Sequence, residues 1–104
     1  MPRIIKKERL TAMYEAIVSL RTVEECQRFF EDLCSATELS AMEQRYAVAE
    51  LLMQDRVYLD ILQKTNASTS TISRVKRALY GGTGGLAEAM ERVRNQAEHA
   101  EEES

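Results

Sequence analysis

Residues 56–79 read RVYLDILQKTNASTSTISRVKRAL, and this stretch decides the fold. Its first part predicts a short helix, because the apolar residues Val57, Ile61 and Leu62 follow helical spacing and turn inward. The letters TNAS then interrupt the pattern. Asn66 is one of the few residues other than glycine that tolerate the left-handed conformation a tight turn between helices requires. We therefore predict that one helix ends here and another begins at once.

The second helix begins after Ser68, a residue type that caps helices. Ile72, Val75 and Leu79 mark its inner face. The other positions carry short hydroxyls or basic groups, namely Thr69, Ser70, Thr71, Ser73, Arg74, Lys76 and Arg77. A helix, a short turn and an amphipathic helix in this order form the helix-turn-helix pattern.

The polar face of this second helix is suited to DNA. In a helix-turn-helix, the first turns of the second helix enter the major groove and meet base edges. Small hydroxyls bond phosphates or bases, and arginine reaches phosphate or pairs with guanine. The residues expected to contact DNA are Thr69, Ser70, Thr71, Ser73, Lys76 and Arg77. Taken alone, the pattern fits an ordinary solvent-exposed helix face equally well, because helix-turn-helix folds also serve in protein contacts.

Working back towards the N-terminus, the pattern predicts three more helices. Two of them, at residues 8–20 and 22–35, carry wide apolar stripes, and the second opens with Thr22 and Glu25 as a capping box. The third is expected to begin at a capping box formed by Ser40 and Glu43. A chain of 104 residues buries only about 60 to 70% of its unfolded surface, so these stripes predict a core shared in a homodimer.

After Leu79 the chain reads YGGTGG, which ends the helix because each glycine costs about 1 kcal/mol relative to alanine. Leu86, Met90 and Val93 predict one more short helix, followed by a frayed acidic tail, AEEES. We expect a single all-α structural domain with three parts, namely dimerisation helices at 1–35, a helix-turn-helix core at 36–80, and a glycine hinge with a short helix and tail at 81–104.

The composition agrees with a soluble helical protein of the cytoplasm. The net charge is −3, yet residues 64–80 carry four basic residues and no acid, which indicates a focused electrostatic footprint. No apolar run reaches the roughly 20 residues of a membrane span, and the basic N-terminus lacks the apolar region of a secretory signal. Cys26 and Cys34, eight residues apart on one predicted helix, lie about 12 Å apart and are expected to be free thiols.

Catalysis and metal binding find no support in the sequence. His99, the one histidine, lies in the tail, and no nucleophile stands near an obvious base. The two cysteines lack the spacing of a zinc site. The glycine-rich segment lacks the lysine and hydroxyl residue of a phosphate-binding loop and follows a helix instead of a strand, so a hinge is the better interpretation.

The segment Gln44 to Leu79 resembles the DNA-binding core of the tryptophan-repressor family. Its most specific piece is STSTISRV, and Leu39-Ser40 and Glu50-Leu51-Leu52 also match the family pattern. With YGGTGG directly after the second helix, the chain is most similar to the YerC/YecD branch. The resemblance implies an intertwined, all-helical homodimer that binds double-stranded operator DNA, which in the repressor itself requires bound L-tryptophan.

The resemblance also implies a possible ligand pocket at Gln44, Arg45, Arg74 and Val75. Arg74 falls on one of the two arginines that clamp the tryptophan, whereas Gln44 falls on the other, with Arg45 rotated about 100° from it on a helix. Val75 replaces a glycine beside the indole. DNA binding is therefore expected to transfer better than tryptophan binding, and the identity of a small-molecule corepressor, if there is one, stays open.

Two further departures concern the helix before the turn. Leu59 and Leu62 stand where the repressor holds phosphates with basic residues. The main rival to a DNA-binding regulator is accordingly a helical adaptor that binds another protein without reading DNA. Salt dependence separates the two, because binding that neutralises several phosphates weakens steeply with added salt.

Overall fold

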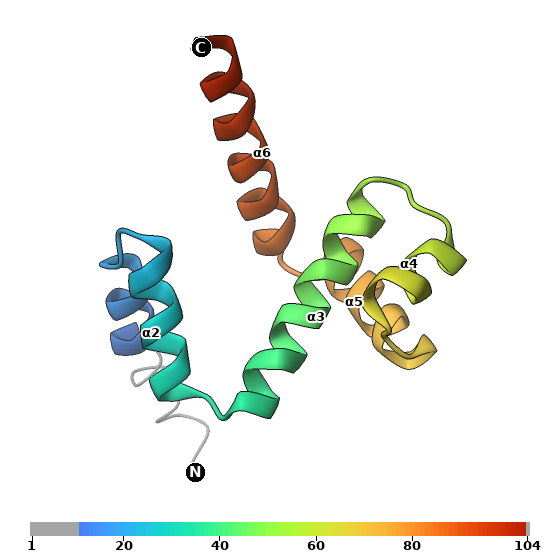
Figure 1. Cartoon of the computed structure of the whole chain (residues 1–104), viewed down its shortest axis with the longest axis horizontal. Coiled ribbons are helices and arrows are strands. Elements are labelled where there is room, and N and C mark those ends of the chain that lie inside the picture. Colours follow the sequence, from blue (N-terminus) through green and yellow to red (C-terminus); the bar gives the residue numbers. More distant parts are fainter. Residues whose placement is uncertain (1–10, 104) are drawn as a thin grey trace. The chain divides into compact units, whose positions relative to one another are not determined.

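The computed structural model describes residues 11–103 and shows a chain of helices (Figure 1). Residues 11–18 are helical, and the start predicted at Glu8 lies outside the described residues. The helices that follow are α2 (Val23–Leu33), α3 (Ala36–Met53), α4 (Tyr58–Thr65), α5 (Thr69–Gly81) and α6 (Gly85–Glu103). No residue in 11–103 is in a strand, and the prediction of an all-α fold is confirmed. None of these helices has the length and apolar character that a membrane span requires.

The chain forms two compact units, the first ending at Leu39 and the second beginning at Ser40. In the first unit, α2 begins at the predicted cap, where the Glu25 N–H donates to Thr22 Oγ1 at 3.1 Å. The Glu25 carboxylate accepts from the Arg21 N–H at 3.0 Å, one residue earlier than a capping box requires. None of the side chains of residues 11–39 is buried.

α3 begins five residues earlier than the sequence pattern suggested. The capping box is formed by Ser35 and Glu38, not by Ser40 and Glu43, so Ser40 lies inside the helix. The Glu38 N–H donates to Ser35 Oγ at 3.1 Å, and the Ser35 N–H donates to Glu38 Oε1 at 2.8 Å. These two reciprocal bonds satisfy backbone donors that have no partner within the helix, which explains the earlier start.

The turn between α4 and α5 agrees with the sequence. Asn66 has φ 57° and ψ 24°, the left-handed conformation, and its N–H donates to Leu62 O at 2.9 Å. Ser68 caps α5, because its Oγ accepts from the Thr71 N–H at 3.2 Å. The inward position of Ile61 is confirmed, whereas that of Val57 is wrong: Val57 precedes α4 and its side chain is 69% exposed.

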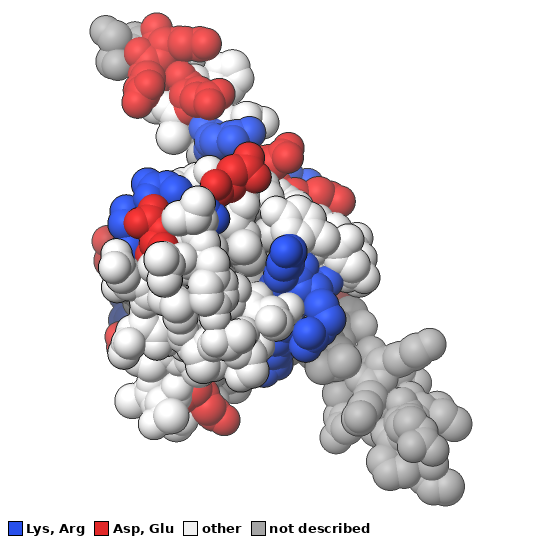
Figure 2. Space-filling view, turned by 90° about the vertical axis from the view of Figure 1, so that its right-hand side faces the viewer, with Lys and Arg blue, Asp and Glu red and all other residues white. Residues whose placement is uncertain are grey.

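The glycine-rich segment ends α5 and leads into α6. A Cβ at Gly82 would lie 2.4 Å from Ala78 O, and Gly84 has φ +91°, so both positions exclude a side chain. Gly81, in contrast, has open space around it. α6 is not short, since it continues to Glu103 through the predicted tail, and its glutamates gather at the upper end of Figure 2.

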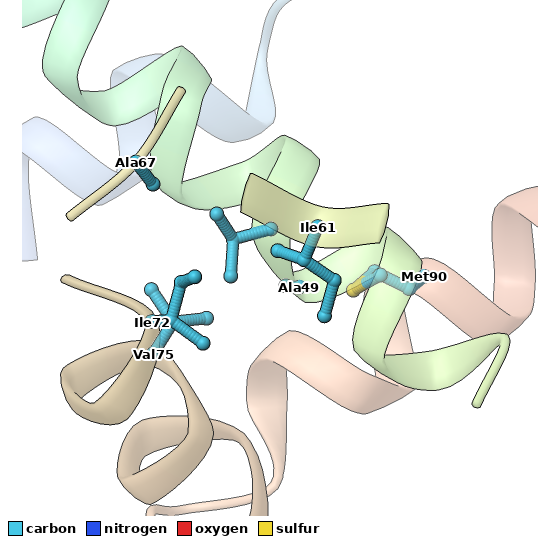
Figure 3. Close-up of a cluster of buried hydrophobic side chains, with 7 residues drawn as sticks. Ala49, Ile61, Ala67, Ile72, Val75 and Met90 are labelled. Carbon is cyan, nitrogen blue, oxygen red and sulfur yellow. The ribbon is translucent and has the colours of Figure 1, made fainter. Parts of the chain in front are cut away.

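The second unit encloses the core. Figure 3 shows side chains from every helix of this unit and from the turn pointing toward one another. The buried members are Val48, Ala49, Ile61, Ala67, Ile72, Val75, Leu79 and Met90. Burial of an aliphatic side chain of this size contributes roughly 1.5 to 3 kcal/mol, so the core fixes α5 against α3 and α4.

Candidate nucleic-acid interface

α5 carries its polar residues on the side opposite the core. Ile72 and Val75 are each 4% exposed, and Leu79 is 6% exposed. Ser73, Lys76, Arg77 and Tyr80 line a shallow hollow on the outer face, together with Gly81. Helical spacing places Thr69 one turn before Ser73 on the same side. The helix therefore presents one continuous stripe of hydroxyls and basic groups to solvent.

The charged side chains of α5 are all basic. α5 contains no acidic residue, and Lys76 and Arg77 are exposed. Figure 2 faces the side that carries α4 and α5 and shows a group of lysine and arginine side chains beside a broad uncharged face. The acidic side chains near the end of α6 lie apart from this group, at the upper end of the view. Such an arrangement favours a polyanion on the α5 side of an otherwise acidic chain.

The hydroxyls at the start of α5 are linked to one another through Ser68. The Ser68 hydroxyl donates to Thr71 Oγ1 at 3.0 Å and lies 3.1 Å from Ser70 Oγ. Because the one proton of Ser68 goes to Thr71, Ser70 is the donor in the second bond. Thr71 is half-buried, whereas Ser70 is exposed. Both side chains are thus held in fixed orientations by the helix cap.

Thr69 and Ser73 differ in their hydrogen bonding. Thr69 Oγ1 lies 2.5 Å from the hydroxyl oxygen of Tyr58, the first residue of α4, and either group is able to donate. Ser73 is exposed, and its hydroxyl makes no hydrogen bond within the part of the chain that the structure describes. Of the four predicted base-reading hydroxyls, that of Ser73 is therefore the one left entirely to a partner molecule. Sequence reasoning did not single out Tyr58, because nothing local in the sequence links it to Thr69.

A cavity of about 280 Å³ lies on another side of α5, where α5 faces α3 and the start of α6. It brings together three of the four residues predicted for a ligand pocket, Arg45, Arg74 and Val75. The remaining walls are apolar or aromatic: Met42, Tyr46, Ala78 and Leu86. The cavity combines two guanidinium groups with apolar walls, which suits a ligand with an anionic group and an apolar body.

Gln44 is not part of this cavity. Its Nε2 donates to Thr65 O at the end of α4, at 3.0 Å, and its side chain lines a separate, polar hollow with Lys64. Of Gln44 and Arg45, it is therefore Arg45 that shares a cavity with Arg74. The comparison with the repressor pattern pairs residues by their position along the chain. It does not show how α3 is rotated about its axis relative to α5, so it does not reveal this exchange.

The two leucines of α4 have different surroundings. Leu62 packs against the core of the second unit, whereas Leu59 is 67% exposed. The described residues contain no group of three histidine, cysteine or acidic side chains arranged to hold a metal ion. Cys26 and Cys34 are free thiols, as predicted.

A family model described as Trp repressor protein matches residues 8–94 of the chain, which include α2 to α5, both arginines of the cavity and about half of α6. The chain belongs to the Trp repressor family. The relative in Bacillus subtilis (strain 168) is the uncharacterized protein YerC, which is 41% identical over 90 residues that cover 86% of each protein. The resemblance to the YerC branch is thereby confirmed.

Two solved structures share the Trp repressor fold with this chain. One is a TrpR-like protein from Eubacterium eligens, with a TM-score of 0.81 and 42% identity, covering 88% of this chain and 94% of the other. The second is a candidate Trp repressor from Staphylococcus aureus, with a TM-score of 0.80 and 39% identity, covering 84% of this chain and 87% of the other. This is a family of regulators, not of enzymes.

Proposed function

We propose that the protein is a sequence-specific, DNA-binding transcriptional regulator that acts as a homodimer, with repression as the expected outcome. The observation that carries the proposal is the outer stripe of α5, where Ser73, Lys76 and Arg77 are exposed opposite the buried Ile72 and Val75. A helix-turn-helix presents its second helix to the major groove in this way. Membership of the Trp repressor family supports the same conclusion.

Selection of bound fragments from genomic DNA by the purified protein tests the proposal. We expect a few fragments with a shared two-fold symmetric sequence to be enriched, because a symmetric dimer matches two half-sites. Arg77→Ala should weaken binding to all sequences and flatten the slope of log affinity against log salt by about one unit. Arg92→Ala is the matched control, since it removes the same exposed charge from α6.

Unselective fragments, or equal effects of Arg77→Ala and Arg92→Ala, would contradict the proposal. The alternative is the helical adaptor that binds a protein instead of DNA, and the exposed Val57 and Leu59 give it some support. An apolar protein interface is insensitive to salt, whereas neutralisation of phosphates is not. A target bound with the same affinity at low and moderate salt would therefore favour the adaptor.

The dimer is proposed from apolar surface that a single chain leaves open. Tyr14, Val18, Val23 and Leu33 of the first unit are all more than half exposed. In the second unit, Val93 is 59% exposed and lines a groove of about 200 Å³ between α3 and α6, which also carries polar and charged side chains. A second copy covers both surfaces with the same residues, as two-fold symmetry allows. A monomer mass in light scattering at micromolar concentration would contradict this proposal.

We also propose that free L-tryptophan is not the corepressor. Because Arg45 lines the cavity with Arg74, the case rests on Val75, whose branched side chain occupies the place of a glycine beside the indole. Calorimetry should detect no binding of tryptophan at micromolar concentration. Micromolar binding that Arg74→Ala abolishes would overturn this proposal, while leaving DNA binding as such untouched.

A further inference from the structure

The hydroxyl of Tyr58 holds the side chain of Thr69 at the point where α5 begins. Tyr58 is the first residue of α4 and Thr69 the first residue of α5, eleven positions later, and their hydroxyl oxygens are 2.5 Å apart. Both residues are exposed. The bond therefore does not contribute to the core and instead fixes one side chain on the surface proposed to meet DNA.

Fixing the hydroxyl of a threonine also fixes its methyl group. The β-carbon of Thr69 carries both groups, and staggered geometry allows only a few arrangements about χ1. Because Cβ is chiral, the rotamer that directs the hydroxyl to Tyr58 sets the position of the methyl group as well. Without Tyr58, the exposed side chain is free to take the other χ1 rotamers, which place the methyl group elsewhere. The phenol thus decides which group Thr69 offers to a partner.

The neighbouring side chains make this choice relevant to base reading. Ser70 and Thr71 are tied to the cap residue Ser68, so the next free hydroxyl along the stripe is that of Ser73. In the major groove, thymine is the base that presents a C5-methyl group, and threonine methyl is among the groups that contact it. A threonine methyl group held toward the groove therefore favours thymine over bases that lack a methyl group.

We propose that Tyr58 is a positioning residue that turns the Thr69 hydroxyl toward α4, so that Thr69 recognises the methyl group of a thymine in the operator. This inference rests on the proposed DNA-binding function and goes beyond it. Tyr58 acts through Thr69 and reads no base itself. The specificity it confers is for an apolar group and is therefore expected to be independent of salt.

Replacement of thymine by uracil in the selected DNA site tests the inference, because uracil lacks only the methyl group. For the wild type, uracil at one position of each half-site should weaken binding about fourfold, the effect of one buried methyl group. Tyr58→Phe should reduce this ratio to less than twofold and leave the salt slope and the midpoint of thermal unfolding unchanged. Thr69→Ser, which lacks the methyl group, should abolish the ratio.

Thr69→Val should restore the discrimination between thymine and uracil that Tyr58→Phe removes. Valine carries methyl groups at both branch positions, so the fourfold ratio should persist in Thr69→Val and should no longer respond to Tyr58→Phe in the double variant. A structural role of Tyr58 would instead lower the affinity of the double variant as much as that of the single one. Thr69→Ser and Thr69→Val keep Tyr58 and decide whether the methyl group is read, should Tyr58→Phe impair folding.

The outcomes separate the inference from the proposed function. If no DNA site is selected, the proposed function fails and this inference fails with it. If a site is selected but every uracil is tolerated, or if Tyr58→Phe keeps the whole fourfold ratio, DNA binding stands and the role of Tyr58 is overturned. Loss of the ratio in Thr69→Val would likewise overturn it, because the hydroxyl and not the methyl group would then be read.

Discussion

Residues 11–39 and residues 40–104 use the same kind of amphipathic helix, yet only the second region encloses its apolar side chains. In the second region, Val48 and Ala49 are fully buried and Ile61 is 1% exposed. In the first, none of the side chains is buried, and Val18 is 83% exposed. Amphipathic periodicity thus predicts a helix face that needs a partner without saying whether the partner belongs to the same chain. The difference is what the proposed function requires, since a dimer needs an open apolar face and a recognition helix needs a core that holds it in place.

A substitution in the core of the second region should produce the largest effect, a loss of free energy of unfolding. Ile61→Ala removes a fully buried side chain of α4 and should lower the free energy of unfolding by about 2 to 5 kcal/mol. Val57→Ala, on an exposed side chain just before the same helix, should change it by less than about 0.5 kcal/mol. Urea denaturation at one fixed protein concentration measures both. Equal effects would mean that the core is not where the structure places it.

The open face of the first region should show the next largest effect, on association and not on folding of one chain. Val18→Asp should raise the dimer dissociation constant at least about thirtyfold, because a carboxylate would enter an apolar interface worth roughly 2 kcal/mol at this position. Val57→Asp places the same charge on the second region and is the control, with no change expected. Sedimentation equilibrium gives both constants. An unaltered constant for Val18→Asp would break the comparison.

The cap of α5 should contribute less to the stability of the fold than a core side chain does. Ser68→Ala removes the acceptor of the Thr71 N–H and should cost about 1 kcal/mol, which lowers the melting temperature by roughly 4 to 8 °C. Ser73→Ala, on the same helix but at a hydroxyl without a hydrogen bond among the described residues, should leave the melting temperature unchanged. If Ser73→Ala were the more destabilising of the two, the division of α5 into a capping turn and a free outer face would be wrong.

Loss of the surface ion pair between Arg56, which precedes α4, and Asp60 of α4 should have the smallest effect on stability. Arg56 Nη1 and Asp60 Oδ2 lie 2.5 Å apart, with side chains 38% and 32% exposed. Exposed pairs of this spacing contribute about 0.3 to 0.5 kcal/mol, so Asp60→Asn should shift the melting temperature by no more than a few degrees at low salt and less at high salt. A shift as large as that of Ser68→Ala would show that the surface of the second region stabilises it as much as a helix cap does.

The sequence predicted those parts of the fold that depend on one residue type at one position. The left-handed Asn66 and the cap at Ser68 follow from the conformational preferences of asparagine and serine. The start of α3 did not follow, because Ser35 and Ser40 both precede a glutamate three residues on, and only the three-dimensional structure decides between two equal patterns. The length of α6 was missed because its charges suggested a tail, although alanine, glutamate and arginine favour helices.

The candidate site was predictable in its residue types and less so in its geometry. The hydroxyls and basic groups of α5 are visible in the sequence because the helix has one periodic apolar face. The bond between Tyr58 and Thr69, and the shared cavity of Arg45 and Arg74, join different helices. Such contacts depend on how the helices are rotated and packed. A rotation of 100° per residue is enough to exchange Gln44 for Arg45 at the cavity.

The segment between α5 and α6 has a consequence for the evolution of this protein. Its four glycines look interchangeable in the sequence, yet a Cβ at Gly82 would collide with the Ala78 carbonyl and Gly84 has a positive φ, whereas Gly81 has open space around it. Codons 82 and 84 should therefore be under strong purifying selection, and codon 81 should drift. In an alignment of many homologous sequences, alanine and serine should be more frequent at position 81 than at position 82.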